Sequence, residues 1–176
     1  IELSDTPPSD LILNPGFENG LSAWIQDGLN FRNMESSSEN QHSGSYSAKA
    51  IIEDTTSDGV DYWSRIFQEF DFSAGQQLYS TLWVKTDIDP ISTATAGLLV
   101  EFLDSSGVVI GEIQDDIGGQ SGWTYLYVTG TSPTDTAKAR VSCFVSCPEA
   151  DTPLGGIAYF DDVVASLDAL PPPDFP

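Results

Sequence analysis

Short stretches of alternating apolar and polar residues run through the middle of the chain. They are rich in β-branched and aromatic residues, and no long segment repeats with the 3.6-residue period of an amphipathic helix. Clusters of Gly, Ser, Asp and Asn separate them, as in turns between strands. The pattern predicts strands at about 10–14, 22–26, 46–53, 62–72, 77–86, 96–103, 107–113, 123–130, 137–146 and 156–166. About ten short strands at this spacing predict an all-β fold, a two-sheet antiparallel β-sandwich of the jelly-roll kind.

The two ends of the chain differ in composition from the middle. Residues 1–9 and 167–176 are rich in proline and acidic residues. Proline-rich segments act as stiff spacers between domains. We therefore predict one module over residues 10–166, an N-terminal linker at 1–9 and a Pro-rich C-terminal linker at 167–176.

The charge of the chain narrows the choice of partner. There are 27 acidic residues against 6 basic ones, for a formal net charge of −21. Such a field repels nucleic acid, anionic membranes and polyanionic polymers. No apolar run approaches the roughly 18 residues that a membrane helix needs. We predict no nucleic-acid and no membrane partner, and a ligand that is neutral, cationic or a metal ion.

The residues that could carry enzymatic chemistry are few. His42 is the single histidine, and no Ser-His-Asp, Cys-His or phosphate-loop pattern is readable. Cys143 and Cys147 are four residues apart, about 13 Å in a straight strand, whereas a disulfide needs Cα atoms within about 7 Å. Two free, core-like thiols are favoured, and a bend at Pro148 is the route to the alternative. Glycoside hydrolysis needs only two carboxylates, so the composition does not decide that case.

Three segments match one known family in order and spacing: 11–18 (LILNPGFE), 68–85 (from QEFDFSAG to LWVK) and 159–163 (YFDDV). Together they resemble carbohydrate-binding modules of the family 4/9/16/22 type, which are jelly-rolls of the galactose-binding-domain-like kind. The similarity covers about residues 10–166. It implies a domain that binds sugar and leaves the chemistry to a neighbouring catalytic domain, so we predict that the chain is not an enzyme.

The resemblance also implies a structural Ca²⁺ where the first and last strands meet. The family pattern maps its ligands to the carbonyls of Gly16 and His42 and the carboxylates of Glu18, Glu39 and Asp161. Glu35, in the same loop as Glu39, is a rival for that position. Carboxylates and carbonyls are the oxygen ligands that calcium takes. The alternative is that Glu18 and Asp161 are ordinary surface acids in an acid-rich chain.

The segment 62–72 (YWSRIFQEFDF) has two faces. Ile66, Phe70 and Phe72 belong to the face that matches the core positions of the family. The other face presents Trp63, Arg65, Phe67, Glu69 and Asp71. Aromatic rings can stack on pyranose rings, while arginine donates to hydroxyls and glutamate accepts from them. We predict that the second face points outward and binds sugar, although a register slip of one residue would reverse the faces.

A second strand shows the same division. Along 137–145, Ala139, Val141, Cys143 and Val145 are predicted to face the core, and Lys138, Arg140, Ser142 and Phe144 to face outward. We add Arg140 and Phe144 to the predicted sugar-binding residues, with Glu101 from the segment 96–103. For Arg140, a role in offsetting nearby acids is an equal alternative. Trp24 and Trp83 are predicted to be structural.

These observations predict a secreted, monomeric, non-catalytic carbohydrate-binding module. It would hold a parent extracellular enzyme on a neutral polysaccharide or oligosaccharide such as β-glucan, xylan or mannan. The alternative is a calcium-stabilised protein-interaction or adhesion module of a surface protein, since a fold does not fix a function. An open groove beside Trp63 favours sugar, whereas a flat apolar patch favours protein.

Overall fold

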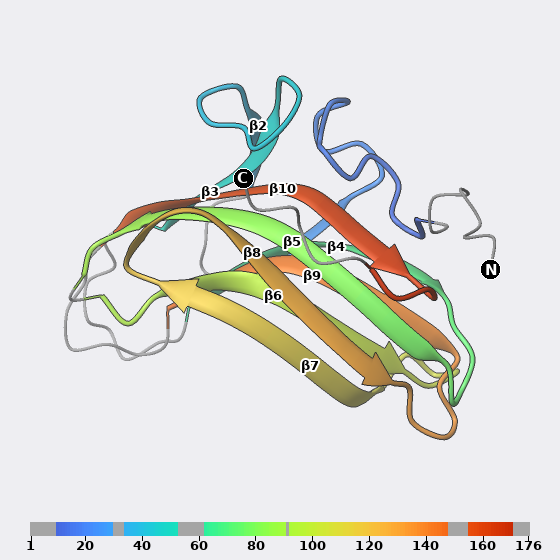
Figure 1. The fold of residues 1–176 in the computed structure, drawn as a ribbon. Coiled ribbons are helices and arrows are strands. Elements are labelled where there is room, and N and C mark those ends of the chain that lie inside the picture. The colour runs from blue at the N-terminus through green and yellow to red at the C-terminus, as the bar shows by residue number, and fades with distance from the viewer. Residues whose placement is uncertain (1–9, 30–33, 53–61, 91, 148–154, 171–176) are drawn as a thin grey trace.

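The computed structural model describes residues 10–29, 34–52, 62–90, 92–147 and 155–170. Its strands are β1 (Ile25–Leu29), β2 (Glu35–Ser37), β3 (Ser47–Ile52), β4 (Tyr62–Asp71), β5 (Gln77–Ile88), β6 (Thr95–Leu103), β7 (Val109–Gly118), β8 (Gln120–Thr131), β9 (Lys138–Cys147) and β10 (Gly156–Ser166). They form two five-stranded sheets that pack face to face (Figure 1). Sheet A has the order β1-β4-β9-β6-β7, and sheet B has the order β2-β3-β10-β5-β8. Every pairing in both sheets is antiparallel, so the predicted β-sandwich of about ten antiparallel strands is confirmed.

The predicted strands differ from the observed ones mainly at the N-terminal end. The segment 10–14 is not a strand: Leu11 donates one backbone hydrogen bond to Ala165 (2.8 Å), but Asn14 has φ 52°. That left-handed conformation ends an extended segment. Residues 35–37 form the short strand β2, which their polar composition did not reveal. Residues 1–9 and 171–176, predicted as linker, lie outside the described residues.

The core lies between the sheets and takes alternate residues from each strand. Among the largest fully buried side chains are Ile66, Leu98 and Val141 from sheet A and Leu82 and Phe160 from sheet B. Trp24 belongs to this core, where its Nε1 donates to the carbonyl of Asn14 (3.2 Å), which confirms its structural role. The described part of the chain holds no helix long and apolar enough to cross a membrane.

Both cysteines on β9 are free and buried, as predicted. Pro148, the possible bend, lies outside the described residues. Burial raises the pKa of the Cys143 thiol above its ordinary value, and burial raises the pKa of Cys147 as well. A thiol reacts as its thiolate, so both should resist modification.

We therefore expect neither cysteine of the folded protein to react with a disulfide reagent such as DTNB at neutral pH. Both should react in guanidinium chloride, where the thiols become solvated. Counting the cysteines that react in the two conditions checks this. A fast-reacting thiol in the native protein would contradict the buried placement.

Candidate functional site

The outer face of sheet A, the face turned away from sheet B, carries the residues predicted to bind sugar. On β4, Ile66 is fully buried in the core and Phe72, next after the strand, also belongs to the core. Trp63, Arg65, Phe67 and Glu69 have the opposite parity, so they project from the outer face. The predicted direction of the two faces is therefore confirmed.

Strand register brings the other predicted residues to the same face. Arg140 on β9 pairs with Glu69 on one side and with Glu101 of β6 on the other. Phe144, four residues along β9, lies directly opposite Arg65. Ala139, Val141, Cys143 and Val145 are in the core, as predicted. All seven predicted sugar-binding residues thus share one face.

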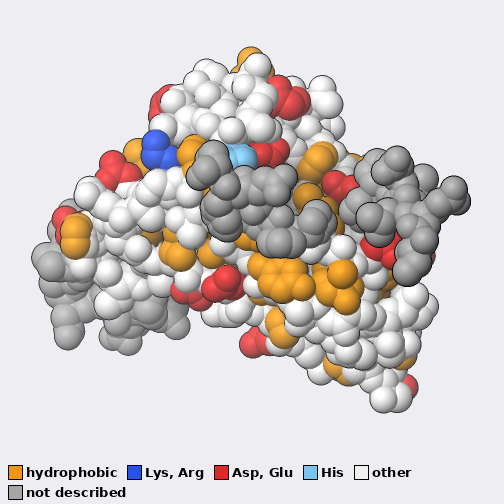
Figure 2. Space-filling view, in the orientation of Figure 1, with side chains coloured by type: hydrophobic (Ala, Val, Ile, Leu, Met, Phe, Trp, Pro, Cys, Tyr) orange, Lys and Arg blue, Asp and Glu red, His pale blue; other side chains and the backbone are white. Residues whose placement is uncertain are grey.

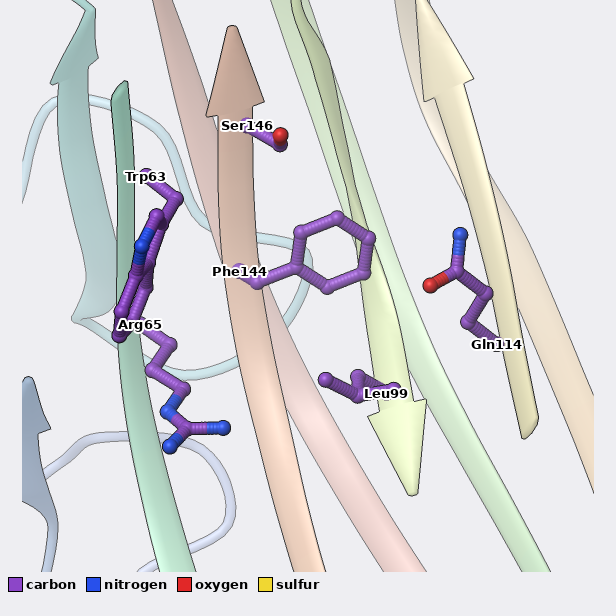
Figure 3. A pocket seen from close by; sticks show the side chains of 6 residues that line it. All are labelled: Trp63, Arg65, Leu99, Gln114, Phe144 and Ser146. Carbon is purple, nitrogen blue, oxygen red and sulfur yellow. The ribbon is translucent and has the colours of Figure 1, made fainter. Parts of the chain in front are cut away.

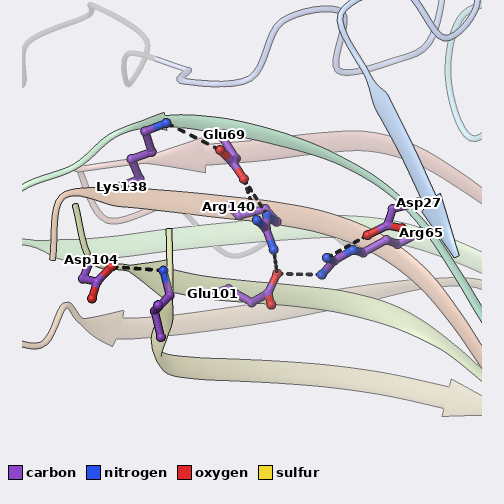
Figure 4. A network of polar contacts seen from close by, with 8 residues as sticks. Asp27, Arg65, Glu69, Glu101, Asp104, Lys138 and Arg140 are labelled. Carbon is purple, nitrogen blue, oxygen red and sulfur yellow. Dashed lines mark hydrogen bonds and ion pairs between the residues drawn. The ribbon is translucent and has the colours of Figure 1, made fainter. Parts of the chain in front are cut away.

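Ion pairs connect β4, β9 and β6, the three central strands of this face (Figure 4). Glu101 Oε2 accepts from Arg65 Nη1 at 2.7 Å and from Arg140 Nη1 at 3.0 Å. Arg140 also donates through Nε (2.9 Å) and Nη2 (2.6 Å) to Glu69 Oε1. These contacts use all three nitrogens of Arg140, so its predicted alternative role in offsetting acidic charge has a structural basis. Glu101 is itself buried, so both guanidinium groups compensate its charge.

Asp27 extends this network on β1, where its carboxylate lies 3.2 Å from Arg65 Nη2. The sequence reasoning missed Asp27. The pairing of β1 with β4 places it directly opposite Arg65. A local pattern carries no signal for that pairing.

The Phe67 ring lies under the two arginines. The guanidinium carbons lie 5.1 Å (Arg65) and 4.8 Å (Arg140) from its centroid, and Phe67 is only 8% exposed. Cations over a ring face are stabilised by its quadrupole. Phe67 therefore supports the arginines and offers no free face to a ligand in this conformation.

A hollow of about 240 Å³ opens beside the network. It is lined by Trp63, Arg65, Leu99, Gln114, Phe144 and Ser146. Figure 3 shows these side chains coming from β4, β9, β6 and β7, with Phe144 between Trp63 and Gln114. Trp63, Arg65 and Phe144 were predicted. Leu99, Gln114 and Ser146 were missed, although Ser146 could have been found because it follows Phe144 on the same side of β9.

Two buried polar atoms on this face lack a partner. Of the buried side-chain nitrogens and oxygens in the described residues, only Arg65 Nε and Ser142 Oγ make no hydrogen bond. Ser142 lies between Phe67 and Leu99 in the register. Unpaired buried donors are rare in folded proteins and call for a ligand, a water or an ion.

The predicted calcium ligands lie at another place, where β10 meets the loop before β3. Asp161 is fully buried, and its Oδ2 accepts from the backbone N–H groups of His42 (2.8 Å) and Ser43 (3.1 Å). Its Oδ1 accepts from the N–H of Asp162 (2.8 Å). Burial raises the pKa of Asp161 to about 6, against the effect of the Ser43 hydrogen bond. The side chain is thus a buried carboxylate whose present partners are all backbone donors.

Glu18 reaches the same loop. Its Oε1 accepts from the N–H groups of Ser45 (2.8 Å) and Tyr46 (3.0 Å). Gly44, at φ 61°, leaves the space that this carboxylate fills. Gly16 lies against Asp161, since a Cβ added there would be 3.6 Å from Asp161 Oδ1. Glu18, Gly16, Asp161 and the backbone of His42 are therefore brought to one loop.

Glu39 is turned to a different environment. Its Oε2 lies 2.7 Å from Lys49 Nζ and accepts from the Tyr159 hydroxyl at 2.9 Å. Glu35 lies 4.0 Å from the same ammonium. Within the described ranges, no group of three or more His, Cys, Asp or Glu side chains is placed to hold a metal ion.

The His42 ring is part of an aromatic stack on the outer face of sheet B. It lies 3.9 Å from the Trp83 ring at an interplanar angle of 14°, and its Nδ1 is 2.6 Å from Asp162 Oδ2. Trp123 meets the imidazole edge-on. Trp83 therefore packs against another side chain, in line with its predicted structural role.

Several solved structures have an architecture similar to this one. A family 61 carbohydrate-binding module in complex with β-1,4-galactotriose is 17% identical, with a TM-score of 0.57 over 89% of this chain and 97% of that one. The C-terminal family 22 module of Clostridium thermocellum Xyn10B is 19% identical, with a TM-score of 0.58 over 86% and 89%. The N-terminal CBM22-GH10 portion of the same xylanase, complexed with xylohexaose, is 16% identical at a TM-score of 0.57 over 86% of this chain and 27% of that one.

The chain has the β-sandwich fold of these carbohydrate-binding modules. The two-sheet β-sandwich that the sequence indicated is thus confirmed. No protein-family model matches the chain, and no curated protein matches it either. At these identities the likeness shows the β-sandwich alone, and the ligand must be argued from the hollow.

Proposed function

We propose that the chain is a non-catalytic carbohydrate-binding module that binds a neutral polysaccharide at the hollow on the outer face of sheet A. The observation that carries this proposal is the lining of the hollow. Trp63, Phe144 and Leu99 offer apolar surface, while Arg65, Gln114 and Ser146 offer hydrogen-bonding groups. An apolar pocket with a few convergent polar groups is the usual form of a small-ligand site, and sugar rings present both kinds of surface.

The charges around the hollow favour a neutral ligand. Three carboxylates, from Asp27, Glu69 and Glu101, face the two guanidinium groups of Arg65 and Arg140. Arginine binds a sulfate or a uronate best through two parallel N–H bonds, and here the guanidinium groups of Arg65 and Arg140 are already paired with protein carboxylates. The protein as a whole is also acidic, with a formal net charge of −21, and red side chains are scattered over the side of the molecule that Figure 2 draws, where blue ones show at one place.

The lining also argues against catalysis in this hollow. Glycoside hydrolysis needs a pair of carboxylates that flank the scissile bond. None of the six described lining residues is acidic. We therefore propose that the module serves a parent extracellular enzyme, whose own catalytic domain would act on the bound polymer. We also propose that the module is monomeric.

A hollow beside Trp63, rather than a flat apolar patch, favours sugar over the protein-interaction or adhesion alternative. The candidate polymers are β-glucan, xylan and mannan. The likeness to a galactotriose-bound module makes β-1,4-galactan a useful addition to the test.

A binding screen tests this function. Affinity gels and calorimetry would compare β-glucan, xylan, mannan and β-1,4-galactan with alginate and a sulfated galactan as polyanionic controls. We expect one neutral polymer to bind and both polyanions to fail. Binding only to the polyanions would overturn the charge argument, and binding to none of the polymers would favour the adhesion module.

We also propose a structural Ca²⁺ at the junction of β10 and the loop before β3. The donor chemistry fits a hard cation: the carboxylates of Glu18 and Asp161 and the carbonyls of Gly16 and His42 are oxygen ligands of the kind calcium takes. The buried charge of Asp161 would gain a counter-ion. We leave Glu39 out of this proposed set because Lys49 already pairs with its carboxylate.

Calcium removal should then lower the thermal stability. A ligand at about 100 times its dissociation constant adds about 2.7 kcal/mol, and each kcal/mol shifts the melting temperature of a 150–250-residue domain by about 2–4 °C. We expect a melting temperature about 5–10 °C lower in EDTA than in calcium by differential scanning calorimetry. Glu18→Gln should reduce this difference, and equal melting temperatures for the unaltered protein would rule out the ion.

A further inference from the structure

We infer that the amide oxygen of Gln114 accepts a hydrogen bond from a hydroxyl of the bound sugar, and that Asp116 is the positioning residue that turns the amide for this role. This inference rests on the proposed function. It adds the residue that recognises a hydroxyl on the β7 side of the hollow and the direction of that hydrogen bond.

Gln114 forms the β7 side of the hollow. It lies directly opposite Leu99 of β6, and both residues line the hollow. The Gln114 side chain is exposed, so a ligand in the hollow can contact its amide. Figure 3 shows the amide oxygen on the side that faces Phe144 and Leu99.

Asp116 decides which end of the amide faces the ligand. Gln114 Nε2 donates to Asp116 Oδ2 at 3.0 Å, and the two side chains lie on the same side of β7 because they are two residues apart. The amide of glutamine has a donating nitrogen and an accepting oxygen, whereas a carboxylate only accepts. Turning the amide over would bring two acceptors together. Nε2 therefore stays with Asp116, and Oε1 is left to accept from a ligand.

A glycine on the neighbouring strand lets Asp116 take this position. Gly97 of β6 lies directly opposite Asp116 on one side and Phe144 of β9 on the other. A Cβ at Gly97 would be 2.6 Å from Asp116 Cβ, closer than two side chains can approach. The glycine thus leaves the room that Asp116 needs beside Gln114, and it puts no side chain between Asp116 and Phe144.

This arrangement selects a ligand by the direction of the hydrogen bond. An accepting oxygen needs a donor, and a sugar hydroxyl supplies one. A uronate carboxylate, a sulfate ester or an acetylated hydroxyl has no hydrogen to donate. The first two would also bring negative charge close to the carboxylate of Asp116. The recognised sugar must therefore present an unsubstituted hydroxyl on the β7 side of the hollow.

Gln114→Ala tests the hydrogen bond. By calorimetry, we expect the affinity for the neutral polymer that binds in the screen to fall about three- to tenfold, the scale of one net hydrogen bond. The matched control is Gln120→Ala. Gln120 is also exposed and its Nε2 also donates to an aspartate, Asp87, at 2.8 Å, but it lies on β8 and does not line the hollow. Affinity of the control should stay within about twofold of that of the unaltered protein.

A double-mutant cycle tests the role of Asp116. Asp116→Asn keeps the size of the side chain but lets the Gln114 amide turn either way, so we expect about two- to fivefold weaker binding. The same substitution should cause no further loss in the Gln114→Ala protein, because Asp116 acts through Gln114. A purely structural role would lower the affinity in both backgrounds.

Asp115→Asn is the control for the change of charge. Asp115 lies opposite Leu98, a core residue, so it has the other parity on β7 and does not line the hollow. We expect this variant to bind like the unaltered protein. Equal losses in Asp116→Asn and Asp115→Asn, or full affinity in Asp116→Asn, would remove Asp116 from the positioning role.

The outcomes separate this inference from the proposed function. If a neutral polymer binds and a folded Gln114→Ala variant binds it equally well, the inference fails and the proposed function stands. If no polymer binds the unaltered protein, both fail.

Discussion

Trp63→Ala should lower the affinity for the bound polysaccharide by at least about 30-fold, or about 2 kcal/mol, the scale of a binding hot spot. Trp63 lines the hollow and is half-buried, so the substitution removes a wide apolar wall. It also removes the ring that lies 5.3 Å from the Arg65 guanidinium, which helps to orient that side chain. Calorimetry against the polymer identified in the screen gives the affinity.

The matched control for Trp63→Ala is Tyr127→Ala. Tyr127 is an aromatic residue with 40% exposure. It lies on β8 in sheet B, away from the hollow. We expect the control to bind like the unaltered protein. Both variants should keep the melting temperature within a few degrees, because neither side chain belongs to the core between the sheets. Retained binding by a folded Trp63→Ala variant would exclude the hollow as the sugar site.

Asp161→Ala should destabilise the fold by about 3 kcal/mol, because three backbone N–H groups lose the buried carboxylate that they share and each donor that water does not reach costs about 1–3 kcal/mol. The carboxylate of Asp161 is fully buried and accepts from the N–H groups of His42, Ser43 and Asp162. These bonds tie β10 to the loop before β3. At about 2–4 °C per kcal/mol, we expect a melting temperature about 6–12 °C lower.

This measurement belongs in EDTA, so that the loss of a calcium ligand does not add to the loss of hydrogen bonds. Asp104→Ala is the control, because Asp104 Oδ1 also accepts from two backbone N–H groups, those of Ser106 and Val108. These donors lie in an exposed turn where water can replace the carboxylate, so we expect a loss of at most about 1 kcal/mol. Equal losses in the two variants would show that burial at Asp161 does not carry the effect.

The comparison of sequence with structure is clearest at Phe67. Its position in YWSRIFQEFDF correctly predicted the outer face, because successive Cβ atoms in a strand point to opposite sides. Its role as an open stacking ring did not follow. Arg65 is two residues away, but Arg140 is brought over the ring by the pairing of β4 with β9. Alternation gives the direction of a side chain and contains no information about what covers it.

The same limit applies at the calcium junction. The motif placed Glu18 and Asp161 correctly at one loop, because the ends of the module meet there in the fold that the sequence resembles. It did not foresee that Lys49 and Tyr159 hold the carboxylate of Glu39. The Lys49 and Tyr159 pairing across β3 and β10 depends on register.

The fold class, the two faces of β4 and β9, and the acidic field that disfavours polyanions can be predicted from the amino-acid sequence alone. These properties depend on local period, composition and motif order. Only the folded chain shows that Leu99 and Gln114 lie beside Trp63 and Phe144, that Asp27 and Glu101 hold Arg65, and that Arg65 Nε is buried without a partner. These neighbours come from five strands whose order and register are set by long-range packing, so no local pattern could place them together.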